Sequence, residues 1–144
     1  MKKSKLLGMQ GLPVKGFNLT SGAFACSGAW DSSDIIVVGA DETDMAAAVN
    51  RIHALQGGAV VCRDGRVLSE IPLPVFGVVS TQPIEVIASQ LKAVKAAVAG
   101  LGVRFPDPIL SIITLTGAAI PYLRICEEGL VNLKDGKTLG LLVE

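Results

Sequence analysis

Histidine is almost missing from this 144-residue sequence, because His53 is the only one. A second histidine would be needed for an HxH or HExxH metal pair, and the position of His53 at the edge of an apolar helix face predicts a surface or boundary role. Cysteine is also scarce: Cys26, Cys62 and Cys126 are far apart and form no CxxC or CxxxH pattern. We expect reduced core cysteines, and no metal site in this chain.

An excess of charge of either sign is absent, since 13 basic and 13 acidic residues give a net charge of zero. Without a basic stripe the sequence predicts no nucleic-acid partner, and the clustered Lys2, Lys3 and Lys5 fit a solvated, flexible tail over residues 1–10. No run of 18 apolar residues exists, so no membrane span is expected, and the N-terminus does not read as a signal peptide. A cytoplasmic location follows.

Hydrophobic residues, in contrast, make up 50% of the chain. That share is enough for one packed domain, which we place at residues 11–144 after the tail. The mean hydropathy of +0.53 is high for a small monomer. A large exposed apolar surface is therefore expected, and with it a homo-oligomer or another protein partner.

Helix-like and strand-like segments are mixed along the chain. Apolar residues recur at helical spacing in 43–56, with Thr43 as N-cap, and in 83–101, so two main helices are predicted there. Strand patterns surround them, at 14–19, 22–29, 35–38, 59–62, 67–71, 122–126 and 129–133, with an irregular or edge strand at 73–79. Residues 109–115 fit a buried strand or a short helix, and 138–143 a last strand or a tail. These patterns predict an α+β two-layer sandwich, in which both helices cover one face of a mixed β-sheet.

The best candidate for a functional loop is Trp30, Asp31, Ser32, Ser33 and Asp34. It places polar side chains and the only tryptophan before a buried strand, where they could line a ligand pocket or an interface. The alternative is an Asx or Ser turn that leads into the strand, with the tryptophan as a core anchor. A serine nucleophile would need a base, and the only histidine is expected on a helix elsewhere.

Asp107 is a second candidate, because prolines on both sides restrict the loop that carries it. It could cap the segment that follows or reach a pocket. The turn at 39–41 joins a strand to a helix as phosphate loops do, but it lacks the GxGxxG glycines and is acidic. The sequence therefore excludes a nucleotide-phosphate site there.

Several runs of this sequence resemble the C-terminal domain of bacterial adenine deaminases, over about residues 11–134. The resemblance rests on 30–61, on GRVLSEIPLPVFGVVS at 65–80, on FPDP at 105–108 and on IPYLRICEEGLVNL at 120–133. Similar domains have His-Asp-Ser-His-Asn where this chain has residues 30–34, so Asp31 and Ser32 match and both histidines are missing. The other matched residues are mostly turn formers, which carry the fold more than any chemistry.

Adenine deaminases of this kind belong to the amidohydrolase group, in which a metal-binding barrel converts adenine to hypoxanthine and ammonia. The metal activates water and needs several converging ligands, and such a barrel needs far more than 144 residues. The resemblance thus implies an accessory or interaction domain that is not catalytic alone. It needs no cofactor, since the divalent metal belongs to a barrel domain or subunit as partner.

Two alternatives stay open at this point. The chain could be a diverged stand-alone protein that binds a purine or another small ligand, which its initial Met-Lys-Lys-Ser-Lys and the two missing histidines favour. It could also be a weak hydrolase in its own right, using Asp31, Ser32 or Asp107 on a purine-like substrate.

Overall fold

The computed structural model describes residues 15–29, 31–32, 34–117, 122–126 and 129–139. The predicted tail at 1–10, the turn at 127–128 and the end of the predicted last strand lie outside these residues. Within them, helices and antiparallel sheets give the predicted α+β class. The elements in chain order are β1 (Ala23–Cys26), β2 (Ile36–Gly39), α1 (Glu42–Leu55), β3 (Gly58–Arg63), β4 (Arg66–Pro72), α2 (Ile84–Gly100), α3 (Pro108–Ile113), η1 (Thr114–Thr116), β5 (Leu123–Cys126), β6 (Gly129–Asn132) and β7 (Lys137–Leu139).

The main sheet has the order β2-β1-β3-β4, and all its neighbouring strands are antiparallel. The predicted mixed sheet is therefore wrong. The α1 crossover makes β2 and β3 run in the same direction, but β1 lies between them and runs against both. The β3–β4 hairpin turns through Asp64 and Gly65, whose φ angles of 55° and 71° fit the expected Asp-Gly turn.

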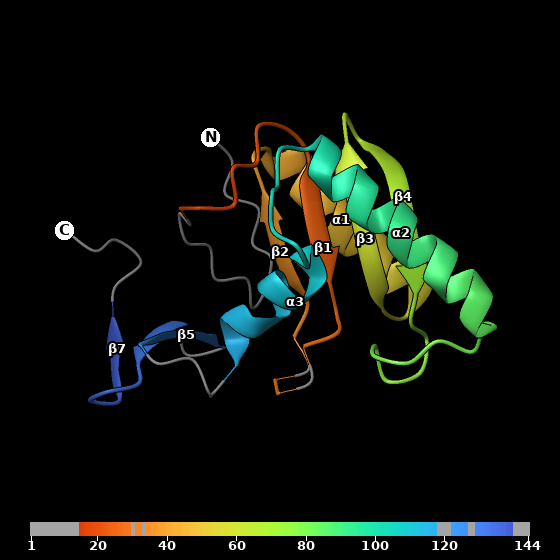
Figure 1. The fold of residues 1–144 in the computed structure, drawn as a ribbon. Coiled ribbons are helices and arrows are strands. Elements are labelled where there is room, and N and C mark those ends of the chain that lie inside the picture. Colours follow the sequence, from red (N-terminus) through yellow and green to blue (C-terminus); the bar gives the residue numbers. More distant parts are fainter. Residues whose placement is uncertain (1–14, 30, 33, 118–121, 127–128, 140–144) are drawn as a thin grey trace.

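The two main helices lie on opposite faces of this sheet (Figure 1), and not on one face as the sequence analysis predicted. The alternation of side chains along β1 shows the division. Phe24 and Cys26 join the core that α2 covers, whereas Ala25 faces Ala48 and Ile52 of α1. The fold thus has three layers, helix, sheet and helix.

The physical reason for the third layer is the burial of the central strands on both faces. Val60 and Val61 of β3 point to opposite sides, and both are 0% exposed. A strand that is apolar on both faces needs cover on both, which one helical layer cannot give.

The chain after α2 forms α3 and η1, so residues 109–115 are the short helix and not the buried strand. A second antiparallel sheet follows, of β5, β6 and β7, and Figure 1 shows it to one side of the molecule. Arg124 on β5 donates from Nε to the carbonyl oxygen of Thr116 at 2.9 Å, which ties this sheet to η1. None of the described helices is long and apolar enough to cross a membrane.

Candidate functional site

The predicted loop lies between β1 and β2, at the end of the main sheet where β1 stops and β3 begins. Asp31 and Ser32 form a turn there; Asp31 is exposed, and the Oγ of Ser32 is buried without a hydrogen-bond partner among the described residues. Asp34 is half-buried just before β2. Trp30 and Ser33 lie outside the described residues, so their predicted roles stay predictions.

Ser27, directly after β1, holds this end of the sheet together. Its Oγ accepts from the backbone N–H of Gly58 at 2.8 Å and donates to the carbonyl oxygen of Gly77 at 2.6 Å. Its own N–H donates to the carbonyl oxygen of Gly58 at 2.9 Å, so Ser27 extends the β1–β3 ladder by one residue. The loop after β1 and the turn at 75–79 are therefore fastened to each other at this end.

A close approach of backbones explains the glycine pair at the end of α1. A Cβ on Gly57 would come within 2.4 Å of the carbonyl oxygen of Leu73 and 2.5 Å of the Cα of Gly77. The φ of Gly57, +128°, also disfavours any other residue. The Gly57-Gly58 pair and Gly77, which lie in the runs that match the family, thus build this end of the sheet.

The turn at 75–78 presents a side chain that the sequence analysis did not select. Phe76 and Gly77 have φ angles of 54° and 75°, and the N–H of Val78 donates to the carbonyl oxygen of Val75 at 3.1 Å, which together make a type I′ turn. Phe76 at its tip is 93% exposed. The sequence feature that could have indicated this exposed side chain is the Phe-Gly pair, which lies in a segment with no charged residue.

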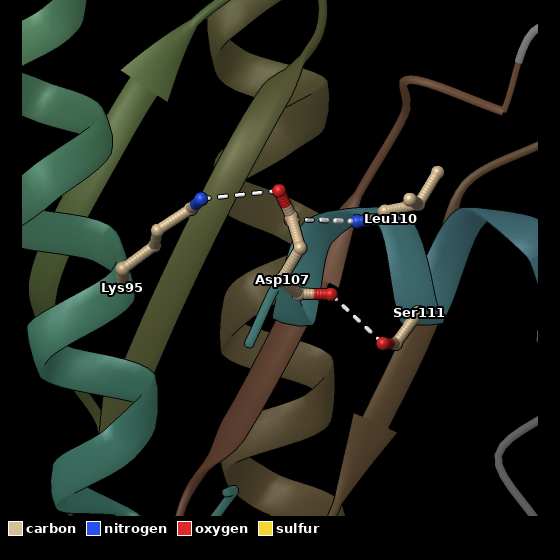
Figure 2. Close-up of polar contacts among 4 residues, drawn as sticks. All are labelled: Lys95, Asp107, Leu110 and Ser111. Carbon is tan, nitrogen blue, oxygen red and sulfur yellow. Dashed lines mark hydrogen bonds and ion pairs between the residues drawn. The ribbon is translucent and has the colours of Figure 1, made fainter. Parts of the chain in front are cut away.

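Asp107 is the N-cap of α3, which is one of the two roles that the sequence offered (Figure 2). Its Oδ1 accepts from the N–H of Leu110 at 3.1 Å, and its Oδ2 pairs with Nζ of Lys95 on α2 at 3.0 Å. The Leu110 N–H, helped by Lys95, holds the pKa of this carboxyl below its usual value. These partners lie on α2 and α3.

The opposite end of the sheet carries a shallow, acidic depression of about 420 Å³. Asp41, and not the predicted Thr43, caps α1, because its Oδ1 accepts from the N–H groups of Thr43 and Asp44 at 2.9 and 3.0 Å. Asp44 is buried and accepts from the N–H groups of Asp64 and Gly65 at 3.2 and 2.7 Å. Protein donors occupy these oxygens, which fits a structural role.

Residues that could bind a metal are dispersed. His53 is exposed on α1, as predicted, while Cys26 and Cys62 are buried free thiols whose pKa values burial raises. The side chain of Cys126 lies outside the described part of the chain. Within that part, no three His, Cys, Asp or Glu side chains converge to hold a metal ion.

Comparison with known proteins agrees with the resemblance. Residues 4–137 match the adenine deaminase C-terminal domain family. The chain is similar to the adenine deaminases of Methylobacterium nodulans, Brucella melitensis and Sinorhizobium fredii, with 43%, 41% and 41% identity over 127 residues. Each alignment covers 88% of this chain but only 22% of the relative, so the chain spans about one fifth of their length. Because the match takes in nearly all its residues, the chain belongs to the adenine deaminase C-terminal domain family.

Proposed function

We propose that this chain is a non-catalytic accessory domain that packs on the catalytic part of an adenine deaminase. The observation that carries the proposal is the unequal coverage, 88% of this chain against 22% of the relative. The relatives have most of their length outside the shared region, and the water-activating metal of amidohydrolase chemistry belongs there. We place the complex in the cytoplasm.

The surroundings of the possible metal ligands in this chain support a catalytic site outside it. Asp107 is engaged with Lys95 and with the first turn of α3, and His53 is exposed on α1. Water activation by a metal requires ligands that converge on the ion. No catalytic step is therefore assigned to these residues; the carboxylate of Asp107 joins α2 to α3.

The test uses this chain together with the Methylobacterium nodulans relative truncated to lack its aligned C-terminal region. We expect the metal-replete chain alone to release no ammonia from adenine, and to form a complex with the truncated enzyme in light scattering. The chain should also restore ammonia release that the truncation lowers. Ammonia release by the chain alone, lost in Asp31→Ala, would instead establish the hydrolase alternative.

Adenine binding is examined on the same samples by thermal shift. A specific rise in melting temperature without ammonia, and without any complex with the truncated enzyme, would replace the proposal with a purine-binding protein. Neither a complex nor a thermal shift would refute the accessory role for this partner.

A further inference from the structure

Phe76 combines two features that are unfavourable for an isolated domain. Its side chain is 93% exposed, although burial of an aromatic ring is favourable. Its φ of 54° is in the left-handed region, which costs free energy for a bulky residue and which Asn or Gly adopts easily. Folding of this chain alone therefore does not explain a phenylalanine at this turn position.

The turn that carries Phe76 is fixed to the sheet. Val75 and Val79 form an isolated antiparallel bridge, and the carbonyl oxygen of Gly77 accepts from Ser27 at 2.6 Å. Because the turn is held from both sides, the backbone that carries the ring is fixed in place. Little backbone entropy is then lost when a partner covers the ring.

The segment that carries the turn has no charged residue. No charged residue occurs between Glu70 and Glu85, a segment that Figure 1 follows from the end of β4 into α2. Depletion of charge around an aromatic side chain is typical of the centre of a protein interface. The exposed apolar side chains of this segment are Phe76 at 93%, Val78 at 40%, Val79 at 52% and Ile84 at 73%. We call these four residues the Phe76 surface.

We propose that the Phe76 surface is where this domain docks, through insertion of the Phe76 ring into an apolar pocket on the catalytic part of an adenine deaminase. The occupant follows from the chain outside the structure: the relatives continue this domain into a much longer polypeptide, of which the alignment covers 22%. An uncharged surface of this kind fits an apolar partner surface. The inference rests on the proposed function, and it names the surface through which the domain would bind the catalytic part.

Phe76→Asn separates docking from folding. Asparagine is favoured before glycine in a type I′ turn, so the variant is expected to unfold at the same or a higher temperature. Loss of a central aromatic anchor is expected to weaken binding to the truncated Methylobacterium nodulans enzyme about 30-fold. A residue needed only for the fold would lose both properties together.

Tyr122→Asn is the matched control, because it also replaces an exposed aromatic side chain with asparagine. Tyr122 is 60% exposed and directly precedes β5, a strand of the second sheet. Titration calorimetry of the three proteins with the truncated enzyme, with light scattering of each alone, gives distinct results. The inference predicts a loss of affinity in Phe76→Asn only. Equal affinity of the wild type and Phe76→Asn, or the same loss in Tyr122→Asn, overturns the inference while the accessory role stands.

No binding by the wild type removes the proposed function, and the inference with it. A homodimer of the wild type that Phe76→Asn dissociates assigns the surface to a second copy of this chain and overturns the assignment to the catalytic part.

Discussion

Ser27→Ala is expected to loosen the end of the sheet that carries both candidate loops. The substitution removes only one oxygen atom from a side chain that is 7% exposed. That oxygen accepts from the N–H of Gly58 at 2.8 Å and donates to the carbonyl oxygen of Gly77 at 2.6 Å. Alanine leaves the N–H of Gly58 and the carbonyl oxygen of Gly77 without this hydrogen-bond partner.

The size of the effect follows from these two bonds. Each neutral hydrogen bond contributes about 1 kcal/mol net, and a buried N–H left unpaired costs about 1–3 kcal/mol. We therefore expect the free energy of unfolding to fall by about 2–4 kcal/mol in Ser27→Ala. With a urea dependence of about 2 kcal/mol per molar, the midpoint should move by about 1–2 M.

The assay is urea unfolding followed by far-ultraviolet circular dichroism, with Ser111→Ala as control. Ser111 also donates from Oγ to a carbonyl oxygen, that of Asp107 at 2.8 Å, but within a helical turn. Such bonds add little to helix stability, so this control should stay within about 0.5 kcal/mol of the wild type. If Ser27→Ala cost no more than Ser111→Ala, the role of Ser27 as the fastening of this sheet end would be refuted.

Three further predictions concern stability. Gly57→Ala should lower the free energy of unfolding in urea by about 3 kcal/mol or more, because its Cβ would lie 2.4 Å from a backbone oxygen. Gly100→Ala, whose Cβ would meet nothing within 4 Å, should be neutral or stabilising. Equal effects of the two substitutions would contradict the close packing at Gly57. Asp44→Asn should cost about 1–3 kcal/mol, since one oxygen acceptor replaces two for the turn N–H groups, and an unchanged midpoint would contradict that role. Asp107 has a lowered pKa when folded, so its contribution is present above the unfolded pKa of about 3.9 and is lost as pH falls through the folded value. The melting temperatures of Asp107→Asn and the wild type should therefore differ at pH 7 and converge toward about pH 2; a constant difference would exclude this carboxylate as the cause.

The sequence predicted the local elements of the main sheet well, because hydrophobic period and turn residues act over short distances. The pairs Gly57-Gly58 and Asp64-Gly65 mark a helix end and a hairpin in the structure as they did in the sequence. The layer arrangement was missed, although residues 59–62 are apolar throughout. Val60 and Val61 in this strand are both buried, and such burial requires cover on two sides of the sheet.

The candidate site was predicted only in part. An aspartate in the loop at Asp107 suits a helix cap and a pocket equally well, so the sequence left both roles open. The residue that distinguishes them is Lys95, which pairs with Asp107 from another helix. Ser27 was not selected, because its partners Gly58 and Gly77 are distant in sequence and no local pattern indicates them. Long-range hydrogen bonds of this kind become visible only when the strands are placed side by side.

Two residues from the runs that match the family serve different purposes. Gly57 is required by contacts within this chain, since it lets two backbones meet. Phe76, in the matched run at 65–80, has no such requirement, because asparagine would suit its backbone better and solvent surrounds its ring. A residue that costs stability in the isolated domain points to a gain made elsewhere, which the proposed docking on the catalytic part of an adenine deaminase would supply.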